Sequence, residues 1–263
     1  SSPVNGNPAS ISRGLMTPHL MTYDFLGGTR PDFGIAAMTE KSPASKGSQR
    51  WLQLAVNQAP ELLDEALRRA GAIIKDDSVT WKSPLRDEGY KEYRDASALR
   101  KLGIATLPGR PLQDFWPPRG PVWDALGISD KGLKILIEAK AHIAEAASPP
   151  SKATPESLEL IRRSLAEART WYAPKAKAEW SENLYQYANR LAFQYLLHKQ
   201  NAISSRVVFI DFVNASDVGG PESEAAWKGA TQLMHALLGL PADIERFGVF
   251  HAYVDVRKIA AAG

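Results

Sequence analysis

The chain has 263 residues, of which 44% are hydrophobic and 23% are charged, and its net charge is +3 with a pI near 9.0. These values are ordinary for a globular protein of one or two domains, and the mildly basic balance permits a nucleic-acid partner without requiring one. The absence of cysteine excludes disulfides, zinc–cysteine sites and thiol catalysis. No apolar run approaches the ~18 residues of a membrane span. We therefore expect a cytoplasmic protein with no membrane partner.

The N-terminal residues 1–48 differ in composition from the rest of the chain. They are rich in Ser, Pro, Gly, Asn and Thr, which predicts an arm that packs on the main body. We expect residues 49–263 to form a single α/β domain. Its first elements are two helices between Gln49 and Gly71, divided at Pro60, because apolar residues recur there at helical spacing.

The segment Asp87–Gly103 is predicted to be a helix that ends at Gly103. Glu88, Glu92 and Asp95 fall on one stripe of this helix, and Glu92 lies on the side expected to face the sheet. Glu92 is therefore the acid that this helix would carry on its inward side, with Asp95 and Glu88 as fallbacks. Basic residues are interleaved with these acids, so a solvated face is an equally good interpretation.

A proline-rich loop follows at residues 107–121. It contains Arg110, Phe115, Trp116 and Arg119, and its prolines predict an extended segment that cannot join the centre of a sheet. Such aromatic and arginine side chains could stack on bases and contact phosphates. They could equally pack onto the core.

The next two apolar segments, Val122–Ile128 and Leu133–Ala141, predict a β-hairpin. If its loop has three residues and ends at Gly132, Asp124 falls directly opposite Glu138. A two-residue loop would place Asp124 on the other face. Gly132 stands where the three-residue loop needs a residue that tolerates a positive φ, which favours that version.

Two facing carboxylates in an apolar hairpin repel each other and lose hydration, and a cation between them offsets that cost. Carboxylate oxygens suit magnesium or manganese, which also bind substrate phosphates. Lys140 shares a strand face with Glu138, where it can hold or deprotonate a water or stabilise charge on a phosphate oxygen. A Glu–Lys pair alone is more often a solvated strand face, but here it follows a continuous apolar run.

Asp124 and the triplet Glu138-Ala139-Lys140, which follows a hydrophobic strand, resemble the D and E-x-K elements of the PD-(D/E)XK nuclease superfamily. The resemblance covers residues 80–215 by the order of elements. It departs from the family pattern in one respect, since Trp123 and not a proline precedes Asp124. The resemblance implies a restriction-endonuclease-like core, a central mixed β-sheet flanked by helices, and metal-dependent phosphodiester hydrolysis.

The resemblance also implies roles for individual residues. Asp124, Glu138 and the carbonyl of Ala139 would bind Mg²⁺ or Mn²⁺, Lys140 would position or deprotonate the attacking water, and Glu92 would assist the metal or the water. Two further residues are secondary candidates: Gln186, as the polar residue that several branches of this superfamily carry on the helix after E-x-K, and Asp95, as a fallback for Glu92. His142 is a third, because it lies two residues beyond Lys140, although a histidine at a strand end more often caps it in solvent.

The C-terminal half is predicted to alternate helices and strands. The expected elements are a helix from Thr154 to Tyr172 with a basic patch, a long helix Glu179–Gln200, and strands Arg206–Asn214 and Gly248–Val256 joined by a helix. We expect a metal-dependent nuclease whose partner is nucleic acid. DNA is the favoured interpretation, and the sequence does not distinguish it from RNA. The alternative is a non-catalytic module that binds nucleic acid or protein on the same fold. Pairing of two chains into a homo-oligomer stays open.

Overall fold

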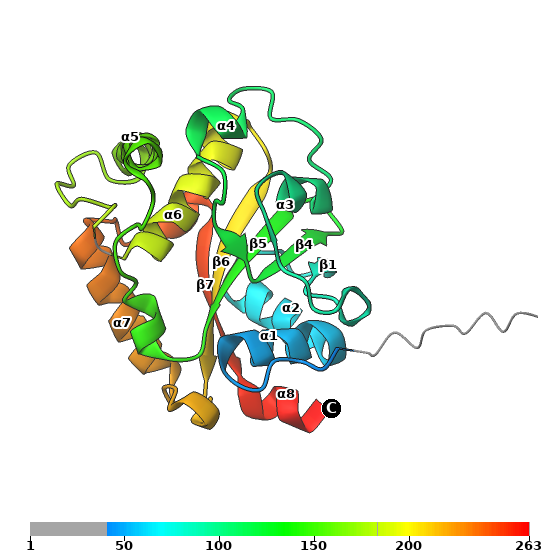
Figure 1. The fold of residues 1–263 in the computed structure, drawn as a ribbon. Helices are drawn as coiled ribbons and strands as arrows, with labels where there is room; N and C mark the ends of the chain where they lie inside the picture. Colours follow the sequence, from blue (N-terminus) through cyan, green and yellow to red (C-terminus); the bar gives the residue numbers. More distant parts are fainter. Residues whose placement is uncertain (1–40, 183, 263) are drawn as a thin grey trace, which may run out of the picture. The chain divides into compact units, whose positions relative to one another are not determined.

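The computed structural model describes residues 41–182 and 184–262, and the predicted N-terminal arm lies outside them as far as residue 40. A five-stranded sheet with the order β1-β4-β5-β6-β7 forms the centre of the described part (Figure 1). Its strands are β1 (Val79–Ser83), β4 (Ala125–Ser129), β5 (Lys134–Lys140), β6 (Ser205–Val213) and β7 (Val249–Asp255). The first two neighbouring pairs are antiparallel and the last two are parallel, so the prediction of an α/β fold with a mixed sheet is confirmed.

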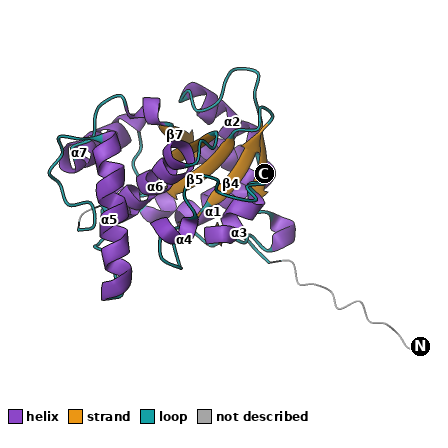
Figure 2. Cartoon of the chain, turned by 90° about the horizontal axis from the view of Figure 1, so that it is seen from above, coloured by secondary structure: helices purple, strands orange, loops and turns teal. Residues whose placement is uncertain are grey.

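Helices cover both faces of this sheet (Figures 1 and 2). One layer consists of α1 (Gly47–Gln58), α2 (Pro60–Arg69) and α8 (Val256–Ala262). The other contains α3 (Asp95–Lys101), α4 (Leu112–Phe115), α5 (Pro155–Tyr172), α6 (Tyr185–Gln194) and α7 (Glu224–Leu238). Because both faces are covered, the central strand β5 buries Ile135 and Ile137 towards the first layer and Leu136 towards the second.

The hairpin prediction is confirmed at its loop. Ser129 N donates to the carbonyl of Leu133 at 2.9 Å, and Gly132 has a φ of +80°, as the three-residue loop requires. The pairing of Ala125 with Ile137 then brings residue 124 beside residue 138. The loop therefore sets which residues meet at the far end of the hairpin. That end lies about five residues away along each strand, or roughly 16 Å at ~3.3 Å per residue.

The predicted strand Val122–Ile128 is wrong in one respect, because it is broken at Asp124. Val122–Trp123 forms a separate strand, β3, which pairs with β2 (Tyr93–Arg94) and not with β5. The break follows from the backbone at Asp124, whose N–H donates to the carbonyl of Ile137 at 3.1 Å outside the regular ladder. This local bend removes Asp124 from the alternation of the strand.

The predicted helix Asp87–Gly103 is also corrected. The second half of the predicted helix is helical, as α3 from Asp95 onwards. The first half is a short 3₁₀ turn, η1 (Arg86–Glu88), followed by extended chain. Gly89 and Tyr90 have φ values of +63° and +59°, which end any helix at that point. The periodic charges that predicted one long helix therefore belong to three different local structures.

Elements of the C-terminal half agree with the prediction, except at the start of the long helix. Thr154 caps α5, since its Oγ1 accepts from Ser157 N at 3.5 Å. The helix expected from Glu179 begins only at Tyr185, after Leu184 takes a φ of +53°, and it continues as a π-helical segment, η3 (Tyr195–Gln200). No helix in the described part of the chain is both long and apolar enough to cross a bilayer.

Candidate functional site

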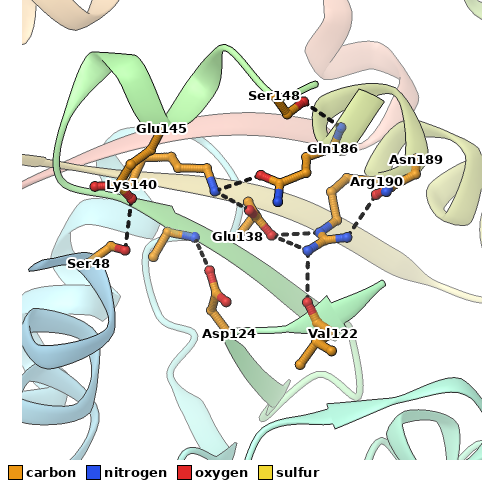
Figure 3. Close-up of polar contacts among 11 residues, drawn as sticks. Ser48, Val122, Asp124, Glu138, Lys140, Glu145, Ser148, Gln186, Asn189 and Arg190 are labelled. Atoms are coloured by element: carbon orange, nitrogen blue, oxygen red, sulfur yellow. Dashed lines mark hydrogen bonds and ion pairs between the residues drawn. The ribbon is translucent and has the colours of Figure 1, made fainter. Parts of the chain in front are cut away.

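A cavity of about 430 Å³ opens where the hairpin ends, between the proline-rich loop, α6 and the segment 148–152. The hairpin contributes Asp124, Glu138, Ala139 and Lys140 to its wall, and α6 contributes polar side chains from the opposite side. The central residues of this site are shown in Figure 3. The structure therefore brings the four residues of the D and E-x-K pattern to one cavity.

Glu138 is the most buried acid of the site, with 3% of its surface exposed. Its Oε1 accepts from Lys140 Nζ at 2.5 Å, and its Oε2 accepts from Arg190 Nε at 2.7 Å (Figure 3). Burial by itself favours the neutral acid, but Arg190 and then Lys140 outweigh it and hold the pKa of Glu138 below its ordinary value. Glu138 is therefore an ionised carboxylate between two cations.

Arg190 was not identified as a site residue from the sequence. Its Nη1 donates to Asn189 Oδ1 and its Nη2 donates to the carbonyl of Val122, both at 2.8 Å, and its guanidinium lies 4.8 Å from the ring centroid of Trp123. These contacts fix the guanidinium in one place and direct it at Glu138. The only sequence signal was an arginine in the middle of an apolar helix, where a buried cation needs a partner.

Lys140 is held from a second side by α6. Its Nζ donates to Gln186 Oε1 at 3.2 Å, and Gln186 N donates to Ser148 Oγ at 2.8 Å (Figure 3). The structure thus brings Gln186, a secondary candidate from the sequence, to the lysine of the E-x-K pattern. An ammonium has three donors, so one remains after the contacts with Glu138 and Gln186.

Asp124 lies directly before the first residue of β4, in the bend that separates β4 from β3. Its Oδ2 accepts from Ala139 N at 2.7 Å, and no hydrogen bond from a described residue reaches its Oδ1. Burial first, and then the charge of Glu138, raise the pKa of Asp124 to about 8. The carboxyl thus stands in surroundings that do not supply enough positive charge for it.

These residues fit a hard divalent cation through their donor atoms. Asp124 has an oxygen without a partner among the described residues, and Oε1 of Glu138 has a lone pair beyond the one that Lys140 uses. Oε2 of Glu138 is occupied by both Nε and Nη2 of Arg190. The amide of Ala139 donates towards Asp124, and because the N–H and C=O of one strand residue point to the same side, the Ala139 carbonyl lies on that edge too. The donors are all oxygen, as Mg²⁺ and Mn²⁺ prefer. Two carboxylates are the whole acidic set, since no three acids or histidines of the described residues converge.

Glu92, the predicted third acid, is not among the residues that line this cavity. It lies in the extended segment before β2, where its Oε1 accepts from Gln49 Nε2 at 2.9 Å. The fallback Glu88 is bound to Tyr93 and Lys101 instead. The reason is the break at residues 89 and 90, which turns both acids away from a common helix face.

The two remaining candidates have local structural contacts. Asp95 accepts hydrogen bonds from the amides of Arg119 and Gly120, so it orders the proline-rich loop. His142 Nδ1 accepts from Ala144 N at 3.0 Å and caps the 3₁₀ helix η2 (Ile143–Ala146). Neither side chain lines the cavity.

Comparison with known proteins adds no relative. No family model, no curated protein and no solved structure matches this chain. The chemistry of the cavity must therefore be argued from its own residues.

Proposed function

We propose that this chain is a metal-dependent nuclease that hydrolyses phosphodiester bonds of DNA and resembles the PD-(D/E)XK superfamily. The observation that carries the proposal is that Asp124, Glu138 and Lys140 line one cavity. There Asp124 Oδ1, which has no hydrogen-bond partner among the described residues, stands beside the ion pairs of Glu138. The order of the three residues along the chain, Asp124 just before β4 and Glu138 and Lys140 on β5, agrees with the motif on which the resemblance depends.

In this proposal the chain's residues divide the work. Asp124, Glu138 and the carbonyl of Ala139 hold Mg²⁺ or Mn²⁺, which when bound stabilises the negative charge that develops on the scissile phosphate. Lys140 uses its remaining donor to position the attacking water or a phosphate oxygen. Gln186 keeps Lys140 in place, and Arg190 keeps Glu138 ionised and adds positive charge behind it. Glu92 has no part in this arrangement.

Cleavage of single-stranded and double-stranded DNA with Mg²⁺ or Mn²⁺ tests the proposal. We expect Asp124→Asn and Lys140→Met each to lower cleavage by about a thousandfold. Lys131→Met is the matched control, because Lys131 is an exposed lysine at the turn of the same hairpin. Wild-type cleavage that both variants retain would contradict the assigned roles.

Loss of activity in Asp124→Asn must be separated from unfolding. The folded pKa of Asp124 is raised to about 8, above its ordinary value of 3.8, so its contribution to stability is full below pH 4 and is lost as the pH rises through 8. Asparagine carries no charge and can still accept from Ala139 N. Without divalent cation at pH 8, we expect Asp124→Asn to melt at the same temperature as the wild type or higher.

One observation favours a second function, a non-catalytic module that binds nucleic acid. Both oxygens of Glu138 already have a cation, so Arg190 could supply permanently the charge that a metal would otherwise bring. Under this alternative the wild type binds DNA equally well with EDTA or with Mg²⁺, cleaves no DNA or RNA, and Asp124→Asn leaves binding unchanged.

A further inference from the structure

The backbone at Arg119 is held in a conformation that only glycine adopts without strain. Its φ is +67°, in the left-handed region. Asp95 fixes it there, since Oδ2 accepts from Arg119 N at 3.1 Å and Oδ1 accepts from Gly120 N at 2.9 Å. A Cβ on Gly120 would lie 2.6 Å from Asp95 Oδ1, so the lock requires glycine at that position. The chain nevertheless carries an arginine, and not a second glycine, at the strained position.

The side chain of Arg119 is exposed and forms part of the cavity wall. Its guanidinium has no ion pair or hydrogen bond with any residue in the described part of the chain. The other candidates on this loop are used within the fold: Arg110 pairs with Glu167 and lies 5.0 Å from the ring of Phe115, while Phe115 and Trp116 are buried. Arg119 alone among the four is left for a ligand.

The charges around the cavity favour an anion. Its wall carries four cationic side chains, Arg119, Lys140, Lys152 and Arg190, and two carboxyl groups, Asp124 and Glu138. Glu138 is already matched by two of the four, and no described residue forms an ion pair with Arg119 or Lys152 at the cavity. The planar guanidinium of an arginine matches two oxygens of a phosphate.

We propose that Arg119 binds a backbone phosphate of the nucleic acid that enters this cavity, and that its left-handed backbone serves to direct the guanidinium there. The proposal rests on the proposed function for the identity of the ligand as nucleic acid. It does not require cleavage, because the contact is with a phosphate and not with the reacting water. Strain that is retained at a ligand-facing residue is a known feature of binding sites.

Two substitutions separate the side chain from the backbone. Arg119→Gly removes the guanidinium and relieves the strain, whereas Arg119→Ala removes the guanidinium and keeps the strain. Arg163→Ala is the matched control for charge, since Arg163 is an exposed arginine on α5 outside the cavity wall. Binding is measured by fluorescence anisotropy of a labelled DNA duplex of about 20 base pairs, two helical turns. The buffer contains EDTA, and KCl is varied from about 50 to 200 mM.

We expect both Arg119 variants to bind DNA about tenfold more weakly than the wild type. The slope of log Kd against log salt concentration should fall by about one phosphate contact in both. The two variants should differ in stability instead, with Arg119→Gly melting about 2–4 °C above Arg119→Ala. Arg163→Ala should stay near the wild type in affinity.

Binding by Arg119→Gly within twofold of the wild type would overturn the inference, as would an equal loss in Arg163→Ala. A loss in Arg119→Ala but not in Arg119→Gly would also overturn it, because the backbone and not the guanidinium would then matter. If the wild type binds DNA and loses affinity in both Arg119 variants but never cleaves, the inference holds and the enzyme proposal fails. If the wild type binds no DNA, both fail together.

Discussion

Glu138 and Asp211 are both buried carboxylates, on the neighbouring strands β5 and β6 and on the α6 side of the sheet. Their partners differ. Glu138 contacts two side chains that carry full positive charge, Arg190 and Lys140, and its pKa is lowered. Asp211 accepts from the ring of His251 at 2.8 Å, and burial outweighs that contact and raises the pKa of Asp211. Two acids at equal depth thus have pKa values that their surroundings shift in opposite directions.

Asp211 is the first member of a row of hydrogen bonds that continues through His251 and Tyr187 to His235, which we call the Asp211 chain. Tyr187 Oη lies 3.1 Å from His251 Nε2 and 2.7 Å from His235 Nε2. Burial first, and then repulsion from His251 when its ring is protonated, lower the pKa of His235 to about 4, so His235 is neutral at pH 7. A neutral His235 can donate to Tyr187, which donates to His251 when that ring is neutral as well. Each member has a hydrogen-bond partner, whereas in the cavity beside Glu138 the Oδ1 of Asp124 and the guanidinium of Arg119 have none among the described residues. Under the proposed function the ligand binds beside Glu138, and we expect the Asp211 chain to contribute to stability alone.

The largest expected effect on stability is at Glu138. Glu138→Gln leaves two cations without a charged partner in a buried place, so the free energy of unfolding should fall by about 3–5 kcal/mol. Glu182→Gln, which breaks the exposed ion pair with Arg162, is the control and should cost less than about 1 kcal/mol. Urea denaturation measures both. Equal costs would show that the Glu138 cluster is accessible to water.

The next effect concerns pH and His235. The pKa of His235 is about 4 in the folded chain and 6.5 ordinarily, so the unfolded chain takes up a proton first and the contribution of His235 to stability falls as the pH drops from 6.5 to 4. Because the side chain is partly exposed, we expect this contribution to fall by about 2–3 kcal/mol, while Asp124 and Asp211, whose raised pKa values act in the opposite direction, offset it in the wild type. His235→Gln keeps a donor for Tyr187 and should remove the loss of unfolding free energy that His235 contributes between pH 6.5 and pH 4. An unchanged pH dependence in this variant would contradict the assignment.

A smaller effect is expected at Tyr187, which lies between the two histidines of the Asp211 chain. Tyr187→Phe removes the hydroxyl between the two imidazoles, which should lower the free energy of unfolding by about 1–2 kcal/mol. DNA binding, measured by anisotropy, should be unchanged, since Tyr187 does not line the cavity of Asp124. A loss of DNA binding at unchanged stability would show that the Asp211 chain belongs to the binding site. The Asp211 chain and the Glu138 cluster would then share one role.

The smallest effect is expected for Asp211→Asn. Its pKa is raised, so the carboxyl gains little from being charged, and the asparagine oxygen can still accept from His251. We expect the free energy of unfolding to change by less than about 1 kcal/mol. The measurement is urea denaturation beside Glu138→Gln, and a loss as large as that of Glu138→Gln would show that Asp211 is held as a full anion.

Much of the site followed from local patterns in the sequence. The three-residue loop at Gly132, a backbone requirement, was enough to place Asp124 beside Glu138 and to put Lys140 on the same strand face. Gln186 was a candidate through the resemblance, as the polar residue on the helix after E-x-K, and its Oε1 lies 3.2 Å from Lys140 Nζ in the structure. Short-range geometry repeats every two residues in a strand, so such inferences carry over a whole hairpin.

What the sequence determined by itself was therefore the order of the elements, the mixed α/β sheet and the pairing at the end of the hairpin. Only the tertiary structure decided that Arg190, 52 residues from Glu138, is its ion-pair partner, that Glu92 lies apart, and that Arg119 opens onto the cavity. The reason is physical. Helix phase and loop direction depend on single residues with positive φ, such as Tyr90 and Arg119, whose conformations are stabilised by contacts from distant parts of the chain.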